Sequence, residues 1–113
     1  MYWKENKYKN KKIQIDMYVF DSIAESKRYK ELALLEKAGE IKDLQLQPRF
    51  ELQESFKKNG KTYRKIEYIA DFMYEENGKM IVEDVKGIQT DVFKIKHKLF
   101  EKKYPELELR IIK

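Results

Sequence analysis

The sequence predicts a single α/β (α+β) domain in which a mixed β-sheet has helices on its faces. Two tight turns, Asn59-Gly60 and Asn77-Gly78, each join a pair of strand-like stretches, as expected for β-hairpins. Segments with helical periodicity precede and follow these hairpins, and a last strand-like stretch, 107–112, follows the second segment. Because strand–helix–strand crossovers are right-handed, this strand should pair in parallel with 80–86. The predicted order is helix, three antiparallel strands, helix and parallel strand.

The composition limits the chemistry that is possible. With 113 residues, of which 42% are hydrophobic and 13% aromatic, the chain is expected to fold as one domain with a modest core. It has no apolar run long enough to span a membrane and no signal-peptide pattern, so we expect no membrane partner. The absence of cysteine and the single histidine, His97, exclude thiolate zinc sites and multi-histidine sites. Any metal must be held by oxygen atoms.

We divide the chain into a basic N-terminal extension, 1–12, and a domain, 13–113. The net charge of +5 favours a polyanionic partner such as nucleic acid. Lysines and aromatic residues are mixed in the extension, which suits contact with a nucleic-acid backbone and stacking on bases. A solvated arm that only keeps the protein soluble explains this composition at least as well. The candidate DNA contacts of the extension are Lys9, Lys11 and Lys12.

The first elements of the domain are a short strand and a helix. Residues 13–20 predict a strand or a small hairpin that bends near Asp16. Asp21-Ser22 opens the helix, which should run to about Ala38 because Gly39 is typical of the position just after a helix C-terminus.

Glu25, in the first turn of this helix, has two interpretations. Ser22 and Glu25 match a capping box, in which the glutamate bonds back to the backbone of the cap residue. At about 100° per residue, however, Glu25 falls on the apolar stripe that contains Tyr29 and Leu32, so it should face the body of the protein. From there it could reach a metal ion held by the sheet, so we keep Glu25 as a candidate ligand.

The stretch 43–56 predicts the next strand, and Pro48 within it requires an edge position or a bulge. Pairing about Asn59-Gly60 gives two facing pairs, Glu54 with Lys65 and Phe56 with Tyr63. The tip of this hairpin is basic and suits a phosphate backbone, although charged tips are common on any sheet. Its candidate DNA contacts are Lys61 and Arg64.

The stretch 68–87 predicts a hairpin around Asn77-Gly78, in which the numbers of facing residues add up to 155. Three facing pairs follow: Ile69 with Lys86, Asp71 with Asp84, and Met73 with Val82. Because side chains alternate between the two faces of a strand, both aspartates and Lys86 share one face. Glu83 lies on the other face unless a β-bulge between 79 and 84 shifts the register.

The facing aspartates, Asp71 and Asp84, indicate a cation site. Like charges directly opposite each other destabilise a strand pair, and both strands are apolar on both faces, as buried strands are. Two buried carboxylates need a cation to offset them, and a hard divalent metal beside Lys86 meets this need. A surface hairpin whose acids and lysine form solvated pairs explains the spacing equally well.

A second helix is predicted from about Thr90 to Tyr104, because Pro105 ends it. Its apolar arc contains Val92, Phe93, Ile95, Leu99, Phe100 and Tyr104. Lys96 projects into the middle of this arc, which makes it a candidate phosphate ligand. A side chain that bends past its neighbours to reach water is the alternative.

The arrangement resembles the PD-(D/E)XK nuclease superfamily, whose restriction-endonuclease-like core has the same α-β-β-β-α-β order. Asp71 matches the first acid of the motif, and Asp84-Val85-Lys86 matches the D-x-K. More narrowly, the stretches 20–41, LQPRF (46–50), YIADF and VEDVKG are similar to a small phage and prophage family of largely unknown function. This similarity covers roughly residues 8–113.

The resemblance implies a Mg²⁺-dependent endodeoxyribonuclease in which Mn²⁺ can substitute. The metal ligands it implies are the carboxylates of Glu25, Asp71 and Asp84 and the backbone carbonyl of Val85. Lys86 would orient the attacking water or stabilise the charge of the transition state. The similarity to Holliday-junction resolvases and phage endonuclease I-type enzymes implies branched DNA as substrate. It also implies a homodimer that acts in phage replication or recombination in the bacterial cytoplasm.

Two other functions are compatible with the sequence. One is a nucleic-acid-binding module that kept the fold and lost catalysis, although the complete set of Glu25, Asp71, Asp84 and Lys86 argues against it. The other is a protein-interaction factor whose acids lie on the surface. A rise in melting temperature with Mg²⁺ or Mn²⁺ would separate both from a nuclease.

Overall fold

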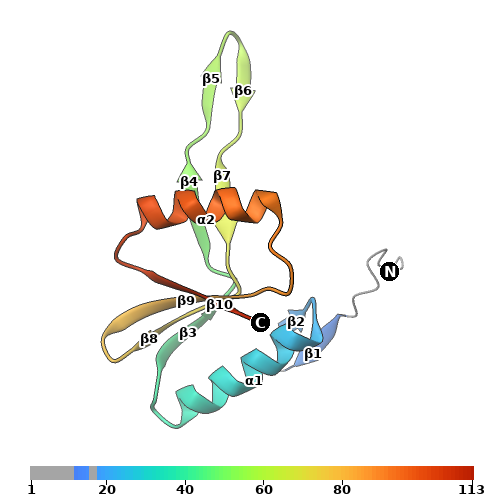
Figure 1. Ribbon diagram of the computed structural model, residues 1–113, viewed down its shortest axis with the longest axis vertical. Helices are drawn as coiled ribbons and strands as arrows, with labels where there is room; N and C mark the ends of the chain where they lie inside the picture. Colours follow the sequence, from blue (N-terminus) through green and yellow to red (C-terminus); the bar gives the residue numbers. More distant parts are fainter. Residues whose placement is uncertain (1–11, 16–17) are drawn as a thin grey trace.

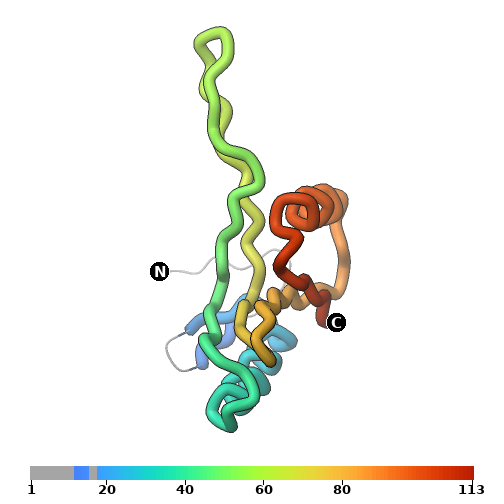
Figure 2. Tube along the Cα trace, turned by 90° about the vertical axis from the view of Figure 1, so that its left-hand side faces the viewer, coloured from blue at the N-terminus to red at the C-terminus, as the bar shows by residue number. Residues whose placement is uncertain are grey.

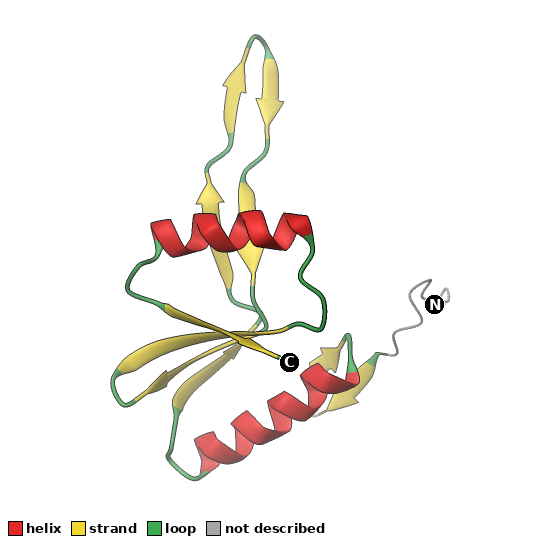
Figure 3. Ribbon diagram, in the orientation of Figure 1, coloured by secondary structure: helices red, strands yellow, loops and turns green. Residues whose placement is uncertain are grey.

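The computed structural model describes residues 12–15 and 18–113. Its elements are β1 (Ile13–Ile15), β2 (Tyr18–Phe20), α1 (Ile23–Lys37), β3 (Lys42–Leu46), β4 (Arg49–Gln53), β5 (Phe56–Lys58), β6 (Lys61–Tyr63), β7 (Ile66–Ile69), β8 (Phe72–Glu76), β9 (Lys79–Val85), α2 (Asp91–Lys103) and β10 (Glu108–Ile112). The mixed α+β class is confirmed, and Figure 3 shows how the helices and strands are distributed. The predicted contacts Lys9 and Lys11 and the bend at Asp16 lie outside the described residues.

A four-stranded mixed sheet in the order β10-β9-β8-β3 forms the centre of the fold. β9 pairs antiparallel with β8 in the predicted register, with Met73 facing Val82, and parallel with β10, as the crossover predicted. No register shift interrupts β9, so Glu83 and Asp84 point to opposite faces. The edge position of β3 agrees with the nearby Pro48.

Two strands that were predicted to be continuous are each interrupted by a bend, and the two bends lie next to each other. The expected strand at 43–56 bends at Gln47-Pro48, and the expected strand at 68–76 bends at Ala70-Asp71. Pro48 has no N–H for a sheet ladder, and its carbonyl accepts from the Ala70 N–H at 3.1 Å. Beyond these bends β4 and β7 form a separate two-stranded ribbon, so Ile69 pairs with Arg49. The predicted pair of Ile69 and Lys86 is therefore wrong.

The ribbon continues into β5 and β6 and projects far beyond the rest of the molecule (Figure 2). Phe56 faces Tyr63 across the Asn59-Gly60 turn, as predicted. Glu54 and Lys65 fall between the two paired segments of the ribbon, and the amine of Lys65 lies 3.2 Å from the carboxylate of Glu67.

Two hydrophobic clusters cover the two faces of the sheet, and the helices lie on opposite sides of it (Figure 1). The α1 cluster contains Phe20, Tyr29, Leu32, Ile41, Phe72, Tyr74 and Ile81. The α2 cluster contains Phe50, Leu52, Tyr68, Ala70, Val82, Phe93 and Phe100. The β1–β2 hairpin, which was expected as a strand or hairpin at 13–20, packs against α1.

The buried face of α2 is narrower than predicted. Of the predicted apolar arc, Phe93 and Phe100 are buried, but Val92, Ile95 and Leu99 are 63%, 60% and 41% exposed. The reason is that α2 packs largely over the two-stranded β4–β7 ribbon, where Phe100 contacts the rings of Phe50 and Tyr68. A ribbon this narrow can cover only one stripe of the helix. In the described part of the chain, no helix is both long and apolar enough to cross a membrane.

Candidate active site

The break between β7 and β8 brings Asp71 and Asp84 together on the α2 side of the sheet. Asp84 is in β9 and 2% exposed, and Asp71 lies in the bend just before β8. The backbone N–H of Val85 donates to Asp71 Oδ2 at 2.7 Å, and the Asp71 N–H donates to the Glu83 carbonyl at 3.0 Å. The carboxyl groups of Asp71 and Asp84 also share a hydrogen bond. The two aspartates therefore lie together as predicted, although Asp71 is in a bend and the paired register of β8 with β9 ends at Phe72 and Glu83.

The first turn of α1 adds the carboxyl group of Glu25. Ser22 caps the helix and accepts from the Glu25 N–H at 3.1 Å, which is the serine half of the predicted capping box. The Glu25 side chain is 8% exposed and hydrogen-bonds to the Asp71 side chain and to the backbone of Asp21. It therefore faces the body of the protein, as the apolar stripe predicted, and it reaches the first aspartate of the hairpin.

These three acids carry more negative charge than their surroundings stabilise. Burial, together with the charges of Glu25 and Asp84, raises the pKa of Asp71 to about 8 against the lowering effect of the Val85 N–H. Burial is also the largest cause that raises the pKa of Glu25, followed by the charge of Asp21. Without a cation, the cluster keeps a proton on Asp71 at neutral pH.

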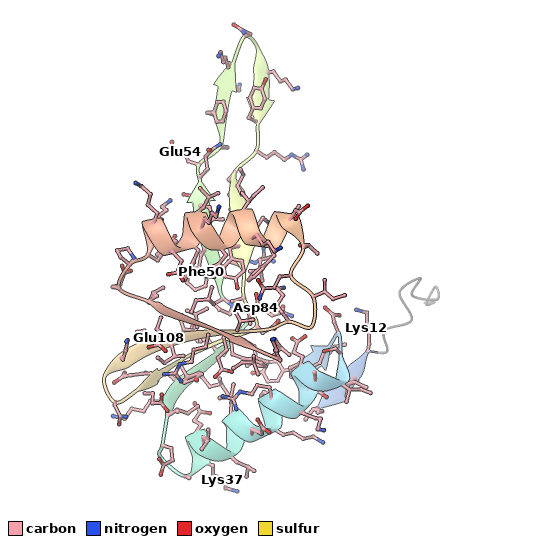
Figure 4. All side chains as sticks on the ribbon, viewed as in Figure 1. Lys12, Lys37, Phe50, Glu54, Asp84 and Glu108 are labelled. Atoms are coloured by element: carbon pink, nitrogen blue, oxygen red, sulfur yellow. The ribbon has the colours of Figure 1, made fainter. Side chains whose placement is uncertain are left out.

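Lys86 supplies the positive charge that pairs with this cluster among the described residues. Its Nζ lies 3.5 Å from Asp84 Oδ1 and 4.8 Å from the centre of the Phe93 ring. The Lys86 N–H also donates to the Ile112 carbonyl at 2.8 Å, which fixes the backbone that carries the side chain. One ammonium group faces three carboxyl groups, so the negative charge of the cluster is only partly offset. Figure 4 labels Asp84 at this position, between α2 and the sheet.

The sequence matches, over residues 5–113, the family described as Protein of unknown function (DUF1064). The chain belongs to the DUF1064 family. No curated protein matches the sequence.

Tyr68 also belongs to the carboxyl cluster and was not predicted from the sequence. Its hydroxyl donates to Asp84 Oδ2, and it is buried in the α2 cluster. Burial, followed by the hydrogen bond to Asp84, raises the pKa of Tyr68, so the phenol stays protonated and acts as a donor. A buried tyrosine needs a partner for its hydroxyl, and this requirement was the signal available in the sequence.

On the other face of the sheet, Glu83 has a complete set of partners. Arg28 of α1 binds it through Nε and Nη2, at 2.7 Å and 2.6 Å, and the Tyr74 hydroxyl donates to its Oε2. This confirms the prediction that Glu83 points away from Asp84. Arg28 could have been identified, because it follows Glu25 by three residues and so shares its face of the helix.

The other residues that were predicted to contact DNA lie outside the carboxyl cluster. Lys12 pairs with Asp21 at 2.6 Å. Lys96 lines a surface groove of about 410 Å³ between α2 and β7, together with Val92, Ile95 and Leu99. Lys61 and Arg64 are at the far end of the ribbon. The structure thus brings together Glu25, Asp71, Asp84, Val85 and Lys86, and none of the outlying cations.

The donor set fits a hard divalent cation in its chemistry. Carboxylate and carbonyl oxygens are the ligands that Mg²⁺ and Mn²⁺ prefer. The N–H and C=O of one strand residue point to the same side, so the Val85 carbonyl faces the Asp71 side as its N–H does. The described side chains include no group of three histidine, cysteine or acidic residues already arranged around a metal position. A bound cation would therefore replace the hydrogen bonds that the acids now make to one another.

Proposed function

We propose that this protein is a metal-dependent endodeoxyribonuclease with a restriction-endonuclease-like core. The observation that carries the proposal is the cluster of buried Glu25 and Asp84 with half-buried Asp71, whose negative charge is only partly offset by Lys86. An acid whose pKa is strongly raised, as that of Asp71 is, and that lies beside other acids is typical of a functional site. The order α1, β3, β8, β9, α2 and β10 supports the fold assignment, with the β4–β7 ribbon inserted between β3 and β8.

Glu25, Asp71, Asp84 and the Val85 carbonyl would hold Mg²⁺, and Mn²⁺ would substitute for it. Such an ion polarises a phosphate oxygen and lowers the pKa of a bound water. Asp84 is held for this role by the Tyr68 hydroxyl, and Asp71 by the Val85 N–H. Both aspartates thus keep one oxygen bonded to the protein, which fixes the direction of the other.

Lys86 is the residue that would act on the substrate from the protein side. Its ammonium group lies between Asp84 and the face of the Phe93 ring, so it is held in place by charge and by a cation–π contact. From this position it donates hydrogen bonds to an attacking water or to a phosphate oxygen that gains charge in the transition state. A glutamine or alanine at 86 would lack this charge.

We propose branched DNA of phage replication or recombination as the substrate, cut by a homodimer. The described domain has little surface for reading a long base sequence, which favours recognition of DNA shape over restriction-type specificity. Lys12 is exposed and Lys96 is half-buried, and both would contact phosphates that lie farther along the DNA from the carboxyl cluster. The resemblance to PD-(D/E)XK nucleases also implies cleavage products that carry 5′-phosphates.

The test is cleavage of a DNA panel in Mg²⁺ or Mn²⁺. The panel contains a four-way junction, a flap, a linear duplex and a single strand. We expect paired nicks in the junction that disappear in Lys86→Ala and in Asp84→Asn, whereas the surface control Lys98→Ala keeps them. Cleavage of every substrate would contradict the junction preference alone. Metal-independent DNA binding without any cleavage would contradict the nuclease and favour the binding module.

A further inference from the structure

The outer half of the ribbon, 54–65, is built to contact something outside the domain. β5 and β6 extend beyond α2 along the longest dimension of the molecule, which is 53 Å (Figures 1 and 2). Every residue of this half is exposed, including Phe56 and Tyr63 at 43% and 39%. No helix covers it, so the domain core gains nothing from its length.

The tip has one face that combines aromatic rings with cations. Phe56 and Tyr63 are a facing pair whose rings stack 4.9 Å apart at 11°. Lys58 and Lys61 are the next facing pair on the same face, and the Lys61 amine lies 5.1 Å from the centre of the Tyr63 ring. The stacked rings stiffen the ribbon just below two lysines that repel each other.

The positive charge of the tip has no partner within the described residues. Lys57, Lys58, Lys61 and Arg64 form no ion pair there, whereas Lys65 and Arg49, nearer the base, both pair with Glu67. Like charges directly opposite each other cost stability, which an anion from outside would offset. Charge complementarity therefore points to a polyanion.

We infer that the ribbon tip enters the major groove of duplex DNA about one helical turn from the cleaved phosphate. This inference rests on the proposed nuclease function. The major groove of B-DNA is wide enough for a two-stranded β-ribbon, whereas that of duplex RNA is too narrow. Gly60 precedes Asp71 by eleven residues, which span at most about 36 Å at about 3.3 Å per residue. One turn of B-DNA is about 34 Å.

Double-stranded DNA fits the tip better than a single strand does. The Phe56 and Tyr63 rings stack on each other, and the Lys61 amine lies over the Tyr63 ring. Rings that are already stacked in this way leave little room for the base stacking that single-strand binding uses. The lysines remain free to bind the phosphates on both sides of a groove.

The first experiment measures binding in EDTA, where no cleavage occurs, so that it does not depend on activity. Wild-type protein and the triple variant Lys57→Gln, Lys58→Gln, Lys61→Gln are titrated into a labelled 30-base-pair duplex at several salt concentrations. We expect the triple variant to bind at least about tenfold more weakly, and the slope of log K against log salt to fall by roughly 2.7. The matched control Lys30→Gln, Lys37→Gln, Lys42→Gln removes three exposed charges elsewhere and should bind like wild type.

Equal binding by the triple variant would overturn the inference, and so would an equal loss on single-stranded DNA. If the variant binds normally while the protein cleaves junctions, the ribbon has no role and the nuclease stands. If the variant loses duplex binding while no DNA is cleaved, the ribbon binds DNA and the nuclease falls.

The second experiment maps the position of the tip. Because the chain has no native cysteine, Thr62→Cys provides a single thiol for an iron–EDTA group. We expect DNA scission about 10 base pairs from the enzyme's own cut. Scission next to the cut, or no localised scission in a complex that forms normally, would contradict the proposed placement.

Discussion

Glu83 and Asp84 are neighbours on β9, and the two buried acids differ in how the protein stabilises them. Glu83 is fully buried on the α1 side, where Arg28 binds it through two nitrogens and Tyr74 through a hydroxyl. Asp84 is 2% exposed on the α2 side, where it meets Tyr68, a more distant Lys86 and the carboxyl group of Asp71. One acid has all the partners it needs, and the other shares a site with further acids.

Under the proposed function, this difference separates a structural acid, Glu83, from a metal ligand, Asp84. A buried carboxylate bound by an arginine fork contributes to the fold and has no free oxygen for a ligand. A buried carboxylate that faces two more carboxyl groups is stable only with a proton or a metal cation. We therefore propose that the same strand supports the fold on one face and holds a cation on the other. Substitutions at the two positions should have opposite effects on stability and activity.

The largest expected effect is the loss of activity in Asp84→Asn. Removing one carboxylate from the cation site should reduce the cleavage rate about 10³-fold, since a metal contributes several kcal/mol to the transition state. The melting temperature should not fall, because a repelling charge is also removed. Junction-cleavage rates and thermal unfolding of the same preparation measure both quantities. A variant that keeps its activity would contradict the assignment of Asp84.

Glu83→Gln should have the opposite profile. It leaves Arg28 without its fork partner, and breaking such a pair should lower the free energy of unfolding by about 3 kcal/mol. Cleavage per folded molecule should stay within about threefold of wild type, because Glu83 does not touch the carboxyl cluster. Urea denaturation measures the loss, with Glu31→Gln, the exposed partner of Arg28 at 2.9 Å, as the control that stays near wild type. A stable but inactive Glu83→Gln would place Glu83 in the site.

In the metal-free protein, stability should fall as the pH rises from about 4 to about 8. Asp71 has a pKa of about 8 in the folded protein against an ordinary value of 3.8, so the folded state binds more protons than the unfolded state in this window. Glu25 acts in the same direction. Urea denaturation in EDTA at pH 5 and pH 8 measures the difference, and Asp71→Asn should reduce it. A difference that is unchanged in Asp71→Asn would show that this residue does not carry the shift.

The smallest effects are expected for the two tyrosines that bind these acids. Tyr74→Phe removes a donor to Glu83 and should cost about 1 kcal/mol of stability with little change in activity. Tyr68→Phe removes a donor to Asp84 and should lower the cleavage rate a few-fold, because Asp84 loses one of the contacts that orient it. Parallel measurements of unfolding and cleavage compare the two. If both variants changed stability and cleavage rate by the same amounts, the separate roles proposed for the two faces of the sheet would be contradicted.

Much of the fold could be predicted because local signals determine it. Ser22 and Gly39 mark the ends of α1, and the Asn77-Gly78 turn fixes the register of β8 and β9, which brings Asp71, just before β8, close to Asp84. The split of the strands could not be predicted, because it depends on where β4 and β7 find space away from the sheet. Pro48 indicated an irregularity but not that the partner strand would bend at the same level.

The charged residues of the site could be predicted from the sequence, but the neutral residue that binds them, Tyr68, could not. Spacing placed both aspartates and Lys86 on one face, and helical periodicity turned Glu25 inward. Tyr68 was missed because it lies on β7, in the ribbon and not in the sheet, and the strand break that aims it at Asp84 is a tertiary feature. Lys96 lies among the apolar residues of α2 as predicted and is half-buried, but it lines a surface groove, because α2 covers a narrow ribbon and leaves Val92 and Leu99 exposed.

The most direct test of the account is calorimetric titration of the protein with Mn²⁺ at pH 7.5 without DNA. The account predicts binding that Asp71→Asn and Asp84→Asn each weaken at least about tenfold and that Glu31→Gln leaves unchanged. Proton release should accompany binding to the wild type, because the proton on Asp71 must leave. Mn²⁺ binding of equal strength in wild type and Asp84→Asn, or no binding in any of them, would contradict the claim that the unbalanced acids form a metal site.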